Sequence, residues 1–491
     1  MNRLVFVIAV LFSARFVIAE QPVRTQQPTL RAVDLMVGED VEVTLADGSV
    51  AKVKLVALDE KTDSMAKAVR EGRVTVEVNG EKAVLKSANY HLPQEVGGVQ
   101  IDCPITRGYN ANSGEDSWGL EKDARLRLWP MGSPWIEPGT FVYPLKQRWF
   151  ATMTQFSNEP TYVDGGDKPD RKKIYYHNDL DFGGCEGLTE VIAATDGLVV
   201  SVADKILDGY SLTPVRPRYD VVYLLDGRGW YYRYSHLHTI DGAIQLGTKV
   251  KMGQKIGILG KEGASGGWTH LHFGIKSRQP SGKWGTQEAY AFAWEAYVNE
   301  KKPAVIAVAR PHHFIRAGES IILDGSKSWA AAGKIASYEW TFTDGGKYSQ
   351  PSWTRTYSQP GSYSEILKVT DEAGHVSYDF AVVQVIGSDD KNIPPTIHPT
   401  FWPTTGIKPG QPVTFKVRTF RDEGGETWDF GDGSPRVSVK SDGNAKPLAK
   451  DGYAVTEHRF SKAGDYVVSV EHTNARGERA IGHLWVRVEA P

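Results

Sequence analysis

Seven consecutive residues, Gly267-Trp268-Thr269-His270-Leu271-His272-Phe273, carry the strongest indication of fold and chemistry in this 491-residue chain. In a β-strand, residues two apart point to the same face, so His270 and His272 would project together while Leu271 faces the core. Two imidazoles side by side on one face indicate a polar site. The stretch therefore predicts a strand with one functional face and one buried face.

Two further clusters of the same chemistry lie upstream, between positions 177 and 240. His177 and Asp181 are four residues apart, and His236 and His238 repeat the spacing of two. Imidazole and carboxylate are good zinc ligands, and a catalytic zinc takes three protein ligands and keeps one position open. A lone histidine is more often a hydrogen-bonded core or surface residue, but three clusters favour a metal site. Spacing alone leaves both His-x-His pairs as candidates.

The order of motifs resembles a known family of enzymes. Five segments carry the resemblance: His177–Phe182, Ala193–Val199, Tyr234–Leu237, Gly247–Gly257 and Gly267–Phe273. They are similar to H-x-G-x-D-F, A-A-x-x-G-x-V, Y-x-H-L, G-x-x-V-x-x-G-Q-x-I-G and G-x-x-H-L-H-F, the successive motifs of lysostaphin-type (LytM-like) zinc endopeptidases of family M23. The resemblance covers residues 170–278 and implies an antiparallel β-sheet peptidase domain.

The resemblance also implies a role for each candidate residue. The implied zinc (Zn²⁺) ligands are His177, Asp181 and His272. The implied catalytic histidines are His236 and His270, which leaves His238 as a bystander or a contact of the site. Zinc lowers the pKa of its bound water to about 7 and polarises the scissile carbonyl. One imidazole would take the proton of that water, and the second would stabilise the oxyanion or protonate the amine.

Three features depart from the family pattern. Asp179 replaces the usual glycine of the first motif. This additional carboxylate could bind the metal, tune a neighbouring residue or simply be solvated, and we expect it to be solvated, as exposed charges usually are. Gly274 replaces the common acidic residue after His-Leu-His-Phe, which puts a contact around the metal site in doubt but no ligand. The segment 204–220 is longer than the corresponding loop and would wall the substrate groove.

Composition and the start of the chain indicate where the protein acts. The chain is 41% hydrophobic and 24% charged, with a formal net charge of −2. This balance gives no electrostatic basis for binding nucleic acid, so no such partner is expected. Residues 1–19 combine Arg3, an apolar run over Leu4–Phe12 and a small residue at Ala19, which is typical of a signal peptide. We therefore expect a secreted or periplasmic protein with no membrane span in its mature form.

The chain has two cysteines, Cys103 and Cys185. In an oxidising compartment they allow one disulfide, which would tie the N-terminal region to the segment beside the proposed metal site. Two separate buried thiols are the alternative, and the sequence leaves both open.

The remaining patterns predict a mainly β, multidomain protein, because the chain is too long for a single core. Alternating apolar residues joined by Asp47-Gly48 and Asn79-Gly80 predict a small β-rich domain over 33–100. Residues 101–150 are less regular and are expected to connect this domain to the peptidase domain, on which they would pack. The peptidase domain is expected over 151–300, with one helix near Glu288–Val298.

Residues 303–388 and 393–491 form an internal repeat. In each half a Trp-x-Phe strand enters an Asp-Gly turn and a Gly-x-Tyr strand follows. The matching segments are Trp340–Gly345 with Gly361–Tyr363, and Trp428–Gly433 with Gly464–Tyr466. They resemble the PKD (polycystic kidney disease) repeat, an immunoglobulin-like β-sandwich. We expect the tryptophans and phenylalanines to be core residues, and Thr343 to alter the first turn because the family has glycine there.

Together the resemblances imply a secreted zinc-dependent endopeptidase that cuts peptide stems or cross-bridges of peptidoglycan, or another extracellular peptide polymer. The C-terminal repeats would bind polymer or protein and raise the local concentration of substrate. One alternative is a non-catalytic protein that binds the cell wall or activates a hydrolase, and another is a scaffold with structural zinc. Asn110 and Asn112 are weak candidates for an inhibitory residue upstream of the site, with an ordinary polar loop as the simpler interpretation.

Overall fold

The computed structural model describes residues 24–65, 67–87, 90–111, 116–149, 160–162, 174–387, 393–450 and 452–491. The predicted signal peptide and Asn112 lie outside these residues, as do parts of the predicted connecting segment and peptidase domain. Asn110 lies in α1 (Arg107–Ala111). Among the described residues, no helix is long and apolar enough to cross a membrane.

The N-terminal part is built from two four-stranded antiparallel sheets. The strands are β1 (Arg31–Leu35), β2 (Asp40–Thr44), β3 (Val50–Thr62), β4 (Val69–Val78), β5 (Glu81–Ser87), β6 (Gln94–Val96), β7 (Val99–Thr106) and β8 (Ala124–Pro130). The sheet orders are β1-β8-β7-β6 and β2-β3-β4-β5. Both sheets share one apolar core that runs from Leu35 to Leu128.

The segment predicted to connect the domains, 101–150, divides in two. Most of β7 and all of β8 fall within it, yet both belong to the N-terminal sheets, and both are buried along their whole length. A strand that is buried on both faces shows no alternation of apolar and polar residues in its sequence. Even charged residues are buried here: Arg125 pairs with Asp34 inside the protein, with 2.7 Å between Nε and Oδ1. Residues further on, including Phe141 and Trp149, pack in a second core, which they share with Phe182 and Phe273.

The part of the chain that the sequence predicts to be the peptidase, here residues 160–302, has a large antiparallel sheet. Its strands, with those of two small sheets beside it, are β9 (Pro160–Tyr162), β10 (Ile174–Tyr176), β11 (Leu180–Gly183), β12 (Glu190–Ile192), β13 (Gly197–Val202), β14 (Lys205–Ile206), β15 (Val222–Leu225), β16 (Tyr231–Ser235), β17 (Leu237–Ile240), β18 (Lys249–Val250), β19 (Lys255–Leu259), β20 (His270–Arg278) and β21 (Trp284–Thr286). The main path is β11-β20-β16-β15-β13-β14, and β12, β19 and β17 form a second sheet.

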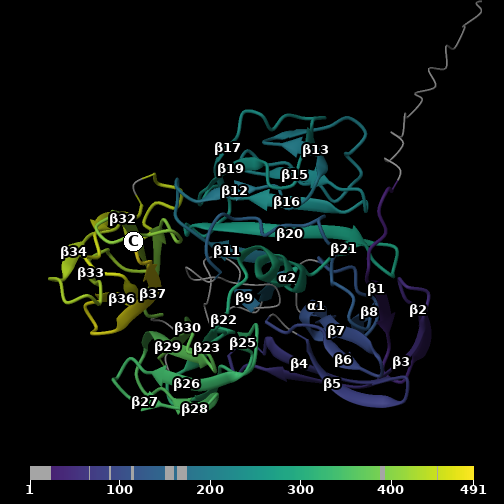
Figure 1. Ribbon diagram of the computed structural model, residues 1–491, viewed down its shortest axis with the longest axis horizontal. Helices are drawn as coiled ribbons and strands as arrows, with labels where there is room; N and C mark the ends of the chain where they lie inside the picture. The colour runs from purple at the N-terminus through teal and green to yellow at the C-terminus, as the bar shows by residue number, and fades with distance from the viewer. Residues whose placement is uncertain are drawn as a thin grey trace, which may run out of the picture.

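One helix, α2 (Tyr290–Lys301), packs beside β20 (Figure 1). Its aromatic residues Phe292 and Trp294 share the core that contains Phe273. The helix starts two residues after the predicted Glu288 and ends three residues after Val298. It stops where Lys302 takes the left-handed conformation, with φ at +45°, directly before Pro303.

The C-terminal half forms two β-sandwiches. The strands of the first are β22 (Val305–Ile306), β23 (His313–Arg316), β24 (Ser320–Asp324), β25 (Trp329–Ala330), β26 (Ile335–Thr341), β27 (Lys347–Tyr348), β28 (Ser352–Thr356), β29 (Gly361–Asp371) and β30 (Val376–Ile386). Those of the second are β31 (Thr396–Trp402), β32 (Val413–Phe420), β33 (Glu426–Asp429), β34 (Val437–Val439), β35 (Ala454–His458), β36 (Gly464–Thr473) and β37 (Arg479–Val488). Trp340 and Trp428 are fully buried in their respective cores, which agrees with the expected core role.

The two repeat turns differ, as the sequence suggests. In the second repeat Gly431 has φ at +71°, and an added Cβ would lie 2.6 Å from the carbonyl oxygen of Val467. At the same position of the first repeat, Thr343 donates its backbone N–H and its hydroxyl to Glu365 instead, at 2.7 and 2.8 Å. The threonine therefore anchors its turn by hydrogen bonds where glycine permits a tight approach.

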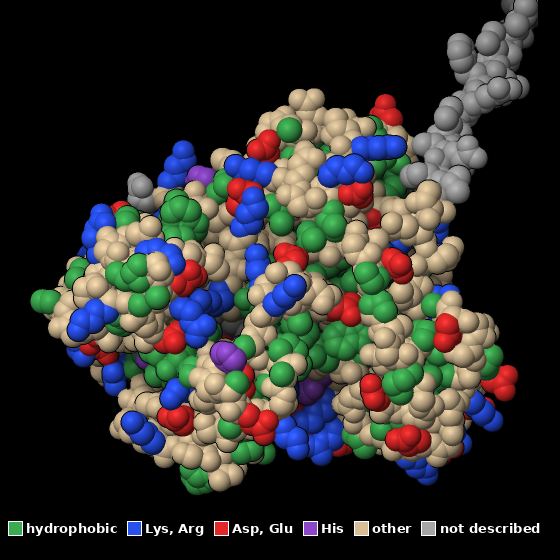
Figure 2. All heavy atoms as spheres, in the orientation of Figure 1, with side chains coloured by type: hydrophobic (Ala, Val, Ile, Leu, Met, Phe, Trp, Pro, Cys, Tyr) green, Lys and Arg blue, Asp and Glu red, His purple; other side chains and the backbone are tan. Residues whose placement is uncertain are grey.

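The parts surround a common centre (Figure 1). The peptidase sheet lies at the top of the view, the N-terminal sheets at the lower right, the first β-sandwich at the lower left and the second at the left. Positive and negative side chains are interspersed over the visible face, in keeping with the near-neutral net charge (Figure 2). The predicted mainly β, multidomain fold is thus confirmed.

Both cysteines are free and buried. Cys103 lies in the N-terminal core, and burial raises the pKa of its thiol to about 12. Burial also raises the pKa of the Cys185 thiol to about 12, and this residue lies beside the second β-sandwich. Of the two alternatives that the sequence left open, the structure has two separate thiols.

Candidate active site

Three side chains that the sequence singles out meet at one edge of the large sheet. His272 on β20 lies opposite Asp181 on β11 in the antiparallel register, and His177 directly follows β10. The distance from His272 Nδ1 to Asp181 Oδ1 is 2.9 Å. His177 Nε2 lies 3.0 Å from each of these two atoms. All three residues are buried.

This triangle fits a metal ion. Its edges of 2.9–3.0 Å are close to the roughly 3.3 Å that separates ligands around a tetrahedral zinc with bonds of about 2.0 Å. Two imidazoles and one carboxylate leave the fourth position open, which is the pattern of catalytic sites. Burial raises the pKa of Asp181, but attraction to His177 and His270 outweighs it and holds that pKa well below its ordinary value. The carboxylate is therefore in the charged form that a cation needs.

The two remaining histidines of interest, His236 and His270, lie beside the triangle. Their ring centroids are 4.6 Å apart. His236 Nδ1 lies 2.5 Å from the carbonyl oxygen of Glu262, and His270 Nδ1 lies 3.1 Å from that of Trp268. Donation to a carbonyl places the ring proton on Nδ1, which leaves Nε2 of each ring as the acceptor. Burial is the largest influence on both rings and lowers the pKa of each, so both rings are uncharged at neutral pH.

His236 has an unusual backbone conformation. Its φ is +68°, in the left-handed region that residues with a side chain rarely adopt, and it falls between the end of β16 and the start of β17. Asp220 holds this conformation by accepting the His236 backbone N–H at 2.8 Å. Arg218 donates to both oxygens of Asp220 and orients it. The long segment 204–220 thus supplies residues that fix a histidine of the site, a role that its length alone does not indicate.

The interruption of the strand at His236, between β16 and β17, explains which His-x-His pair forms the site. His270 and His272 lie in one regular strand and both face the triangle, as the spacing predicts. His236 is not in a strand, so His238 does not share its direction. His238 is instead exposed and lies 3.8 Å from a carboxylate oxygen of Glu262. The structure therefore brings together four histidines and one aspartate and leaves His238 outside.

Asp179 is the residue on which the sequence-based expectation is wrong. It is buried rather than solvated, and its Oδ2 lies 2.9 Å from His272 Nε2. Lys276 on β20 approaches the other oxygen at 3.3 Å. Burial raises the pKa of Asp179, but Lys276 and the hydrogen bond from His272 outweigh it and hold that pKa below its ordinary value. A buried charge is stable here because both oxygens have partners.

Gly274 makes this arrangement possible. It lies two residues after His272, on the same face of β20, and an added Cβ would lie 2.3 Å from Asp179 Oδ2. A side chain at position 274 and the carboxylate of Asp179 therefore occupy the same space. The two positions that depart from the motifs, 179 and 274, thus meet in space, and Asp179 places a carboxylate beside His272.

The site opens into a large cavity. Among the described residues, a space of about 1260 Å³ is lined by side chains from all four parts of the chain. These include Arg70, His177, His270, Trp268, His313 and His398. Its volume is enough for a substrate larger than a single amino acid, because pockets for drug-sized ligands measure about 300–1,000 Å³. The site therefore faces a partly open space that residues from all four parts line.

Comparisons with known proteins agree with this architecture. Residues 175–283 match the model of peptidase family M23, and residues 301–385 and 400–481 match models of the PKD domain. Collagenase ColA of Clostridium perfringens (strain 13 / Type A) is 31% identical over 99 residues, which are 20% of this chain and 8% of the collagenase. The chain thus spans less than a tenth of the length of that curated relative.

Solved structures give further partial likenesses. Csd3 of Helicobacter pylori is 17% identical, with 47% of this chain and 56% of that chain covered and a TM-score of 0.22. The PKD domain of the KIAA 1837 protein is 33% identical, with 17% of this chain and 87% of that chain covered and a TM-score of 0.15. From the matches to family models, the chain contains a peptidase domain of family M23 followed by two PKD domains.

Proposed function

We propose that this protein is a secreted or periplasmic zinc-dependent endopeptidase that hydrolyses peptide bonds in the stems or cross-bridges of peptidoglycan. The observation that carries the proposal is the buried triangle of His177, Asp181 and His272 beside two neutral histidines. The M23 domain supports a peptidase, and the zinc, the substrate and the roles of the residues are inferred from the chemistry of the site.

In this proposal, metal binding and proton transfer belong to different side chains. His177, Asp181 and His272 hold the zinc ion, which when bound acidifies water to a pKa of about 7 and polarises a carbonyl. The Nε2 atoms of His236 and His270 take the proton of the attacking water and return one to the leaving amine. The carbonyls of Glu262 and Trp268 keep the two rings in the tautomer that this exchange requires.

The PKD domains support an extracellular polymer or protein as partner, and a cross-linked wall is such a polymer. The collagenase, which is named for an extracellular protein substrate, is compatible with the same class of partner. We propose that the PKD domains keep the peptidase at the wall.

The test compares zinc content with hydrolysis of purified peptidoglycan. We expect about one zinc ion per chain, hydrolysis that a chelator abolishes, and recovery when zinc is added back. Zinc binding without hydrolysis, where a control peptidase cuts the same wall, would favour the non-catalytic alternative. A purified protein that binds no zinc would overturn the proposal.

A further inference from the structure

The loop before β20 is held by the second PKD domain. Asn444 donates its side-chain N–H to the carbonyl of Gly266 at 3.1 Å, and Arg418 donates to the carbonyl of Gly267. The backbone N–H of Thr269 donates to the hydroxyl of Tyr453 at 2.8 Å. Three polar contacts from one domain therefore fall on three of the four residues directly before His270 in another domain.

The two domains approach too closely at Gly267 for a side chain at that position. Gly267 has φ at +85°, and an added Cβ would lie 2.1 Å from Asn444 Oδ1. On the other side of the contact, a Cβ on Gly452 would lie 2.7 Å from the guanidinium of Arg418. The glycines at positions 267 and 452 thus leave the space that the side chains of Asn444 and Arg418 occupy.

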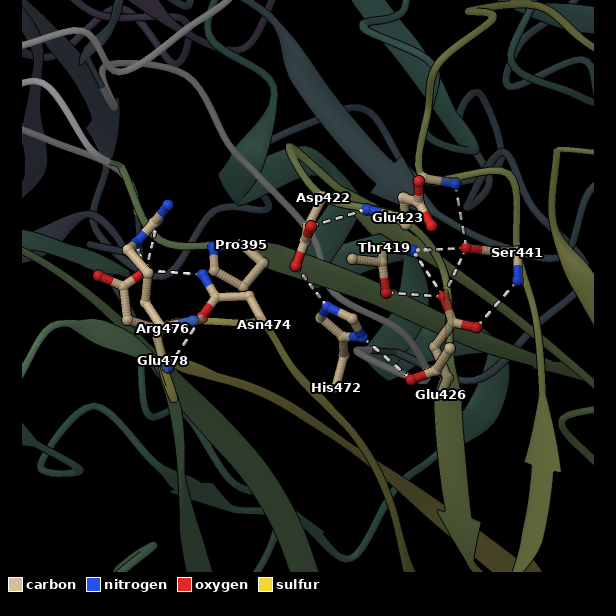
Figure 3. Close-up of polar contacts among 12 residues, drawn as sticks. Pro395, Thr419, Asp422, Glu423, Glu426, Ser441, His472, Asn474, Arg476 and Glu478 are labelled. Carbon is tan, nitrogen blue, oxygen red and sulfur yellow. Dashed lines mark hydrogen bonds and ion pairs between the residues drawn. The ribbon is translucent and has the colours of Figure 1, made fainter.

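The contacts come from side chains that are themselves fixed. Arg418 is fully buried and donates to both oxygens of Asp442 at 2.8 Å. The loop that carries Asp442 and Asn444 begins at Ser441, whose backbone N–H and hydroxyl both donate to the buried Glu426 (Figure 3). Fixed partners lose little conformational freedom when they bind, so the interface is suited to positioning.

Aromatic rings connect this interface to the site through direct contacts. The Trp268 ring stacks on His270 with centroids 3.8 Å apart, and its other neighbour is His398 of the second PKD domain at 5.2 Å. His398 Nδ1 lies 2.8 Å from the hydroxyl of Tyr453, the same hydroxyl that accepts the Thr269 N–H. Tyr453 thus joins the backbone before β20 to the ring that supports Trp268.

We propose that the second PKD domain is a positioning element of the peptidase site, which holds Trp268 and His270 through Tyr453, Arg418 and Asn444. This role is distinct from keeping the enzyme at the wall, and its effect on catalysis rests on the proposed function of His270. A domain that only tethers the enzyme affects hydrolysis of an insoluble wall. A domain that positions His270 also affects hydrolysis of a soluble fragment.

The test is the substitution Tyr453→Phe, which removes one hydroxyl and keeps the ring. Its matched control is Tyr466→Phe, because the Tyr466 hydroxyl donates to the Lys462 carbonyl within the same domain, at an exposed place. On soluble cross-linked fragments released from peptidoglycan, we expect Tyr453→Phe to lower kcat about tenfold or more, with KM and zinc content unchanged. Tyr466→Phe should keep the wild-type values, and Asn444→Ala should follow Tyr453→Phe in direction.

Hydrogen exchange gives a second readout that does not depend on catalysis. In Tyr453→Phe, but not in Tyr466→Phe, the amide of Thr269 should exchange about tenfold faster, because it has lost its acceptor. Unchanged kcat in Tyr453→Phe would overturn the positioning role. If the wild-type protein hydrolyses no fragment, the proposed function fails, and the exchange rate at Thr269 then decides alone whether the second PKD domain holds this loop.

Discussion

At the residue scale, the close packing of Asp179 against Gly274 gives the most specific prediction. Asp179 accepts from His272 Nε2, and a carboxylate in that position orients a metal-binding histidine and makes it more basic. We expect Asp179→Asn to weaken zinc binding about 10- to 100-fold, measured by competition with a chelator of known affinity. The matched control is Asp204→Asn at an exposed turn, which should bind zinc as the wild-type protein does.

The packing of Asp179 against position 274 can also be tested from the side of Gly274. Gly274→Glu alone should lower the melting temperature, because its Cβ would lie 2.3 Å from Asp179 Oδ2. The double variant Asp179→Gly with Gly274→Glu removes the clash and supplies a carboxylate from the other side. Recovery of both melting temperature and zinc affinity is expected, and a double variant no better than Gly274→Glu would show that the two positions are independent.

At the scale of elements, the turn between β16 and β17 sets the position of His236. Asp220 holds the positive φ of His236 through the backbone N–H, with Arg218 behind it. We expect Asp220→Asn to lower hydrolysis about tenfold while zinc content stays at the wild-type level, because the substitution weakens a bond to a charged acceptor. Loss of zinc together with activity would instead assign Asp220 to the metal site.

This turn also shows what the sequence can and cannot predict. The strand from His270 was predictable, because alternation within one strand is a local property. The break at His236 was not, because a positive φ here depends on Asp220, which is sixteen residues away in sequence. The buried state of Asp179 escaped prediction for the same reason, since the space it fills is created by Gly274 on another strand. Strands β7 and β8 were missed because they are buried on both faces.

At the scale of the whole molecule, the folded state of the protein should lose stability in acid. Burial lowers the pKa of His398 from 6.5 to about 3. Between these two values the unfolded chain binds a proton that the folded chain does not, so stability falls as pH falls through this window. At pH 4.5 the loss amounts to about 2–3 kcal/mol for this one residue.

The variant His398→Gln isolates that contribution, because glutamine can still accept from Tyr453 but does not titrate. Its melting temperature should fall less than that of the wild-type protein between pH 6.5 and pH 4.5. Parallel curves for the two proteins would show that His398 takes up a proton as readily in the folded chain as in the unfolded one.

The central claim is a division of labour among the histidines, and one measurement tests it most directly: zinc content and peptidoglycan hydrolysis, determined together in three single variants. We predict that His272→Ala loses both, that His270→Ala keeps zinc but loses hydrolysis at least about 10²-fold, and that His238→Ala keeps both. The account would be contradicted if His238→Ala lost zinc while His272→Ala retained it.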